Sequence, residues 1–166
     1  MQIVGAYTRL GYVYYLQGRY PEAIKIYEQG VAPLADSDHA LKERNLIELH
    51  SKLAATYQKM DQPVDANRHF TEAVTRFERR IARGADDPAT KYYIASLYGL
   101  RGDAEKAVRY LRESIAELPA LNRVRAGADP DFDPIRSDPA FAEALAAGLH
   151  SETVVSLETG SSEPPP

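Results

Sequence analysis

The side chains best suited to metal chemistry are three aspartates near the C-terminal end, Asp129, Asp131 and Asp133. Their alternating spacing is that of an EF-hand calcium loop, which also needs a central glycine and a distal glutamate. Pro134 stands at the glycine position and Ala140 at the glutamate position. We therefore interpret the aspartates as turn-forming residues and expect no metal site.

The histidines do not form a recognisable ligand set or catalytic set. They are His39, His50, His69 and His150, and none belongs to an H-E-x-x-H or H-x₃₋₅-H pair. Glu48 lies two residues before His50 on a predicted helix, so the two side chains leave the helix in different directions. The chain also lacks cysteine, a nucleophile elbow, a dinucleotide-binding motif and a phosphate loop. We expect no enzymatic activity and no cofactor.

Composition narrows the class of partner. The 166 residues carry 20 Lys and Arg against 24 Asp and Glu, a formal net charge of −4. Nucleic-acid binding needs a concentrated basic face, so we expect no nucleic-acid partner. No apolar run approaches the roughly 20 residues that cross a bilayer, and the apolar N-terminus lacks the features of a signal peptide. The sequence predicts a cytoplasmic protein without a membrane partner.

Three segments recur in register, beginning at Leu10, Leu53 and Ile94. Each continues with a tyrosine, a turn position, an alanine and a final small residue. These four positions are Tyr14, Gly18, Ala23 and Gly30, then Tyr57, Asp61, Ala66 and Ala73, then Tyr98, Gly102, Ala107 and Ser114. Small residues are expected where two helices approach closely, and glycine where the turn needs a positive φ. The pattern predicts three helical hairpins that bury their apolar stripes by stacking.

This pattern resembles the tetratricopeptide-repeat (TPR) family, whose consensus places W-x₂-L-G-x₂-Y before A-x₃-F. The resemblance covers about residues 4 to 119, with Tyr7, His50 and Lys91 in place of the leading tryptophan. It implies an all-α fold: a right-handed α-solenoid of about three hairpins plus a short C-terminal capping helix. The repeats are expected at about 4–36, 37–83 and 88–119, within a solenoid domain of residues 1–150.

The repeats are longer than the usual unit of about 34 residues, because successive repeats begin 43 and 41 residues apart. The surplus before the second repeat contains candidate N-cap residues, Asp36, Ser37 and Asp38. We expect a long helix from about Ser37 to Met60. In its geometry this longer unit is similar to the extended repeats of kinesin light chain and related adaptors.

A proline-rich closing segment, 120–149, follows the third repeat. Asp138 and Pro139 fit the N-cap and first residue of a short helix that ends near Ala147. The segment resembles the one that closes repeat arrays in bacterial regulatory proteins, including those fused to kinases or cyclases. The resemblance implies that three apolar residues cover the third repeat: Phe132, Ile135 and Phe141. The polar residues 151–166 are expected to be disordered.

In the TPR family the concave groove is lined by first-helix positions, which can be carried over by register. The residues so implied are Arg9, Tyr12, Tyr15, Lys52, Lys59, Tyr92, Tyr93 and Ser96. Tyrosines mixed with arginine and lysine suit an extended or helical peptide with some acidic character. An ordinary solvated face with structural tyrosines is the alternative.

The first helix carries more apolar surface than one hairpin partner can cover. We predict a self-association face there that includes Ile3, Val4 and Tyr7. Terminal repeats normally have a polar outer face. Either the chain is the end of a longer array, or this face meets another molecule, possibly a second copy.

Two functions follow. The leading hypothesis is a scaffold or adaptor that binds a protein or peptide segment in the concave groove. The alternative is a self-association or regulatory module that belongs to a larger bacterial signalling enzyme, a kinase or a cyclase.

Overall fold

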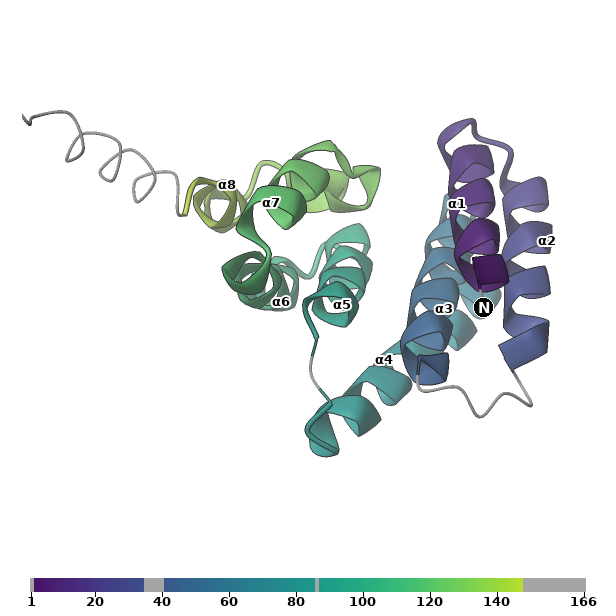
Figure 1. The fold of residues 1–166 in the computed structure, drawn as a ribbon. Coiled ribbons are helices and arrows are strands. Elements are labelled where there is room, and N and C mark those ends of the chain that lie inside the picture. The colour runs from purple at the N-terminus through teal and green to yellow at the C-terminus, as the bar shows by residue number, and fades with distance from the viewer. Residues whose placement is uncertain (1, 35–40, 86, 148–166) are drawn as a thin grey trace, which may run out of the picture.

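The computed structural model describes residues 2–34, 41–85 and 87–147, without the side chains of Gln2 and Ile3, and over these residues it contains helices and no strands. Three helical hairpins follow one another: α1 (Gln2–Leu16) with α2 (Tyr20–Val31), α3 (Lys42–Lys59) with α4 (Pro63–Ala82), and α5 (Pro88–Leu100) with α6 (Ala104–Glu117). A short 3₁₀ turn, η1 (Ala32–Leu34), follows α2. The hairpins stack in chain order (Figure 1). The expected all-α solenoid is confirmed.

The closing segment forms three further elements: α7 (Pro119–Ala128), the 3₁₀ segment η2 (Pro130–Ile135) and α8 (Pro139–Ala146). The expected short helix after Asp138 is confirmed, because the Asp138 side chain accepts a hydrogen bond from the backbone N–H of Ala140 at 2.8 Å. The apolar residues Phe132, Ile135 and Phe141 are buried in one cluster with residues of α5 and α6, as predicted. Helix α7 was not predicted from the sequence.

The turns within the hairpins have the backbone that the repeat pattern predicts. Gly18 has φ 73° and Gly102 has φ 75°, a region that costs glycine little. Asp61 stands at the same position of the second hairpin with φ 55°. Aspartate tolerates this left-handed conformation better than most residues do.

The recurring small residues lie where helices touch. A Cβ atom at Gly11 would lie 2.4 Å from the ring of Tyr27, so α1 and α2 can approach only because Gly11 has no side chain. Ala54 and Ala95 occupy the same position in the next two hairpins and are buried. Gly30 packs in the same way against Leu49 of the next hairpin. These contacts connect each hairpin internally and to its neighbour.

The second hairpin is preceded by a turn residue, Leu41, the first residue described after the gap. Helix α3 starts at Lys42, after Leu41, and ends at Lys59, close to the predicted end. Several predictions lie outside the described residues: the helix start at Ser37 with its N-cap candidates, the histidines at 39 and 150, and the tail 151–166. No helix within residues 2–34, 41–85 and 87–147 is long and apolar enough to cross a membrane.

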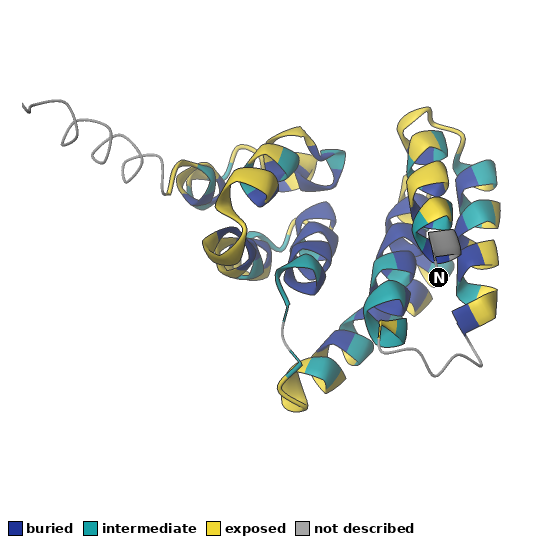
Figure 2. Ribbon diagram, in the orientation of Figure 1, coloured by how far each residue is buried: buried dark blue, intermediate teal, exposed yellow. Residues whose placement is uncertain are grey.

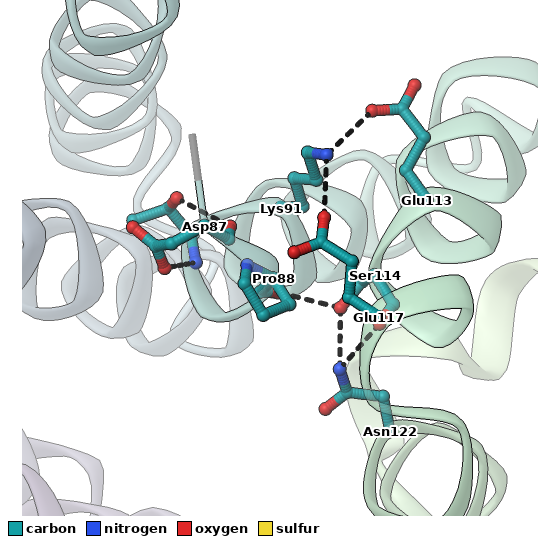
Figure 3. Close-up of polar contacts among 8 residues, drawn as sticks. Asp87, Pro88, Lys91, Glu113, Ser114, Glu117 and Asn122 are labelled. Carbon is teal, nitrogen blue, oxygen red and sulfur yellow. Dashed lines mark hydrogen bonds and ion pairs between the residues drawn. The ribbon is translucent and has the colours of Figure 1, made fainter. Parts of the chain in front are cut away.

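A polar network fixes α7 to the third hairpin (Figure 3). The Ser114 hydroxyl donates to the backbone oxygen of Pro88 at 2.7 Å. The Asn122 amide of α7 then donates to the Ser114 hydroxyl at 2.7 Å and to its backbone oxygen at 3.0 Å. Lys91 lies 3.0 Å from Glu117 and 3.4 Å from Glu113, which joins α5 to α6. Asn122 therefore anchors the start of the closing segment to the third hairpin.

Candidate functional site on the concave face

The first helices of the three hairpins direct polar side chains at the closing segment. Tyr15 of α1 donates a hydrogen bond from its hydroxyl to a carboxylate oxygen of Asp131 at 2.7 Å. Lys52 of α3 places its ammonium 3.6 Å from the other oxygen of Asp131. Tyr92 of α5 donates to Asp129 at 3.0 Å. Asp131 of η2 and Asp129, its N-cap, thus contact the first helices of all three hairpins, on the side where the family resemblance implies the concave groove.

These interactions are buried, which sets their electrostatics. Asp131 is 2% exposed, and burial raises the pKa of its carboxyl although the nearby Lys52 ammonium acts in the opposite direction. Burial, with Asp131 close by, raises the pKa of the Tyr15 hydroxyl. Burial also raises the pKa of Tyr12 to about 12. Tyr15 and Asp131 are therefore held without free access to water, whereas Tyr12 is half-buried, and both tyrosines stay protonated near pH 7.

Two cations lie on aromatic rings at the edge of this network. The Lys52 ammonium is 4.6 Å from the centre of the Tyr12 ring, and the Arg125 guanidinium of α7 is 4.0 Å from the centre of the Tyr92 ring. Arg125 also lies 5.2 Å from the Tyr93 ring. Such contacts hold long cationic side chains in fixed positions. These contacts extend the polar network to Tyr12 and Arg125.

One small cavity stays open beside the network. Its volume is about 230 Å³, and its lining comes from α1, α3 and α7: Thr8, Arg9, Tyr12, Glu48, Lys52 and Arg125. Arg9 is exposed and forms no ion pair with any residue that the structure describes. The cavity is smaller than the roughly 300–1,000 Å³ of small-molecule sites, so it suits one side chain of a partner.

The predicted groove residues fall into two groups. The structure brings Arg9, Tyr12 and Lys52 together at the open cavity. It buries four others: Tyr15, Tyr92, Tyr93 and Ser96. The last three lie on α5, on which η2 packs. Lys59 is exposed and does not line the cavity. A peptide can therefore reach only part of the predicted groove while η2 is in place.

Several residues of the site were missed by the sequence reasoning. Glu48 was considered only as a partner of His50, and Arg125 was not considered. Asp129 was interpreted as a turn former, and its carboxylate does accept from the backbone N–H of Asp131 at 3.1 Å. Its bond to Tyr92 depends on a fold-back of the chain that local spacing does not reveal. The described residues include no cluster of three or more metal-ligating side chains.

The predicted self-association face is partly wrong. Val4 is 6% exposed and belongs to the core of the first two hairpins, and Tyr7 is half-buried against Gly30. The side chain of Ile3 lies outside the described residues. The large apolar residues that α1 does expose are Leu10, Val13 and Leu16. They lie on the opposite side of the helix from Val4, because each residue turns the helix by about 100°.

The second hairpin contains a histidine pair that the sequence did not reveal. The Nδ1 atoms of His50 on α3 and His69 on α4 are 2.9 Å apart, a distance at which one imidazole donates to the other. The Tyr57 ring stacks on His69 with its centre 5.5 Å away. Burial, together with the nearby His50, lowers the pKa of His69 to about 4. The pair is therefore neutral near pH 7 and fastens α3 to α4.

Two larger hollows lie among the second helices. One, of about 470 Å³, is lined by residues of α4 and α6, and the other, of about 620 Å³, by residues of α6 and α8. Both contain Arg109 and Glu113 side by side on α6. Because arginine and glutamate are mixed in each lining, neither hollow favours a ligand of one charge.

The hairpins, their turn residues and their stacking define the class of an α-helical repeat protein. Residues 4–32, which lie almost entirely in α1 and α2, match the sequence model of the family described as Tetratricopeptide repeat. The first hairpin of the chain is therefore similar to a tetratricopeptide repeat.

Comparisons over the full length add little to this. No curated protein matches the chain. Among solved structures, the chain is similar to the C-terminal TPR-containing domain of an FK506-binding protein of Plasmodium falciparum, with 14% identity, 92% of each chain covered and a TM-score of 0.45.

Proposed function

We propose that this chain is a protein-interaction module that holds a segment of a partner protein at the open cavity of its concave face. Repeat solenoids typically use their concave surfaces for binding, and this chain contains a tetratricopeptide repeat. Segment η2 packs on α5, the first helix of the third hairpin, and covers that part of the face. The proposal therefore concerns the cavity that stays open between α1, α3 and α7.

The observation that carries the proposal is the way the concave face holds an acidic segment of its own chain. A tyrosine hydroxyl and a lysine ammonium from two different hairpins meet on the Asp131 carboxylate. The open cavity shares Lys52 with this arrangement and adds Tyr12 and Arg9. The same kinds of donor are therefore available to a partner immediately beside the bound segment.

The chemistry of the cavity favours an acidic side chain, because its lining holds three cations, Arg9, Lys52 and Arg125, against one carboxylate, Glu48. The charge of Lys52 is balanced by Asp131, and Arg125 is occupied by the tyrosine rings. Arg9 is the cation that a partner can reach, and a guanidinium binds a carboxylate through two parallel hydrogen bonds. Tyr12 supplies an aromatic surface beside it, and aromatic residues and arginine are the common anchors of recognition. We infer an acidic peptide segment as the partner.

Arg9→Glu tests the proposal, because Arg9 is exposed and its replacement leaves the core intact. Lys52 is unsuitable, since reversing its buried charge would disturb the bond to Asp131. A random peptide library is selected on the full chain, on Arg9→Glu and on Arg79→Glu. Arg79 is an exposed arginine on α4, away from the cavity lining, and serves as the matched control.

The expected result is enrichment of acidic peptides by the unaltered chain and by Arg79→Glu, and loss of those peptides with Arg9→Glu. Peptides that bind all three proteins equally, or an absence of any acidic preference, would contradict the proposed site.

A second candidate function is self-association, which the exposed residues Leu10, Val13 and Leu16 of α1 favour.

A further inference from the structure

The outer side of α1 is an apolar face that no described element covers. Leu10, Val13 and Leu16 are large, exposed and spaced three residues apart, so they form one stripe, here called the α1 end face. In the repeat register, Leu53 and Ile94 correspond to Leu10, and both are fully buried. Leu53 packs in the cluster of the first hairpin and Ile94 in that of the second. In the second and third hairpins, the residue that corresponds to Leu10 is therefore covered by the preceding hairpin.

The outer side of α7 is a second apolar face. Its large exposed residues are Leu118, Leu121 and Val124, again three residues apart, here called the α7 end face. All other exposed residues of α7 are also small or apolar: Pro119, Ala120, Gly127 and Ala128. The two arginines of α7 turn away from this face. Arg123 donates to the backbone oxygen of Ala147, and Arg125 lies on the Tyr92 ring.

The two faces lie at opposite ends of the stack. Helix α1 begins the first hairpin and α7 follows the third, and each has an exposed side as well as a buried one (Figures 1 and 2). An isolated solenoid end normally exposes polar residues. Here both ends expose leucine and valine at the same spacing. The apolar helix at one end could therefore cover the apolar helix at the other.

We propose that the chain associates head to tail with a second copy, the α7 end face of one copy covering the α1 end face of the next. The contact continues the stacking of hairpins within the chain, in which an apolar helix covers the first helix of the following unit. Such an interface is heterologous, because two different surfaces meet, and it extends into open chains unless the rotation closes a ring. Arg9, which the proposed peptide site uses, lies one helical turn before Val13 and borders this face, so the two proposals meet at that residue.

The size of the faces sets the strength of the association. Helix α1 is about 22 Å long and α7 about 15 Å, so one helix meets one helix. This contact is smaller than the roughly 800 Å² per partner of a stable complex. The association is therefore expected to be weak and reversible.

Complementary single variants test the arrangement by sedimentation velocity over a range of concentrations. Val13→Glu blocks the α1 end face and Val124→Glu blocks the α7 end face, at residues that are 49% and 74% exposed. Val64→Glu, on α4 at 79% exposure, introduces the same charge away from both faces. We expect the unaltered chain and Val64→Glu to form growing oligomers, and each blocked variant alone to stay monomeric.

The decisive sample is an equal mixture of the two blocked variants. Each variant keeps one intact face, so a head-to-tail contact predicts that the mixture forms dimers and stops there. Association of Val124→Glu alone would show a symmetric contact through α1 and overturn the proposal. A monomeric mixture, or an unaltered chain that stays monomeric into the high micromolar range, would also overturn it.

A cross-linking measurement covers the case in which a glutamate variant misfolds. The chain has no cysteine, so Val13→Cys and Val124→Cys each introduce a single thiol. Mixed under oxidising conditions, they should form mainly the disulfide between positions 13 and 124, and Val64→Cys should form none with either. Disulfides that join only two copies of Val13→Cys would contradict the head-to-tail arrangement.

Discussion

Gly99→Ala is expected to loosen the closing segment from the concave face. A Cβ atom at Gly99 would lie 2.7 Å from Cδ1 of Phe132 and 3.2 Å from the backbone oxygen of Asp131. Two carbon atoms pack best at about 3.5–4.0 Å, so the Phe132 ring would have to withdraw by about 1 Å. Segment η2 can accommodate the methyl group only by moving.

The surroundings oppose that movement. Phe132 is fully buried, with the Tyr92 ring centre 5.9 Å away and the Phe141 ring centre 5.3 Å away. Asp131 is held in turn by Tyr15. Overpacking in such a site typically costs about 1–3 kcal/mol. For a chain of this length, this corresponds to a fall of about 3–10 °C in melting temperature.

Thermal unfolding followed by circular dichroism measures the effect, with limited proteolysis to show whether the closing segment becomes accessible. Gly127→Ala is the control, because nothing lies within 4 Å of a Cβ atom there and alanine favours a helix over glycine. Its melting temperature should stay constant or rise slightly. If Gly99→Ala melts like Gly127→Ala and resists protease equally, η2 does not pack against α5 as described.

Three further predictions concern the fold. Burial lowers the pKa of His69 to about 4, so the unfolded chain takes up the proton first as the pH falls. Stability should be nearly full above about pH 6.5 and fall by about 3 kcal/mol by pH 4, a loss measured by denaturant unfolding and reduced in His69→Gln. Lys52→Met and Asp131→Asn should each lower the free energy of unfolding by about 3 kcal/mol. The double variant should lose at least about 1 kcal/mol less than the sum of the two single losses, because the two side chains interact. Strictly additive losses would show that they do not. Ala107→Leu should cost about 1–3 kcal/mol because Ala107 is fully buried between α5 and α6, and unchanged melting would mean that the repeat register is wrong.

The repeat pattern was sufficient to predict the hairpins. A small residue such as Gly11 or Ala95 records a helix contact directly, because a larger side chain would not fit. The turn positions likewise record a positive φ, even where Asp61 replaces glycine. Of the eight residues that the register placed in a groove, Arg9, Tyr12 and Lys52 line one cavity.

The path of the closing segment could not be predicted in this way. Asp129 and Asp131 contact residues of α5 and α1 that are 37 and 116 positions away, and no local period encodes such contacts. The pairing of His50 with His69 has the same cause, since it depends on how two helices are rotated against each other. The inward orientation of Val4 was missed because the first helix is apolar on more than one side.

Binding of an acidic peptide to the concave cavity tests the central claim most directly. An acidic peptide selected on the unaltered chain is titrated by calorimetry into that chain, Arg9→Glu and Arg79→Glu. We expect binding at least about 10-fold weaker for Arg9→Glu, a loss of about 1.4 kcal/mol or more, and unchanged binding for Arg79→Glu. Equal affinity for all three proteins would contradict the assignment of the cavity as the binding site.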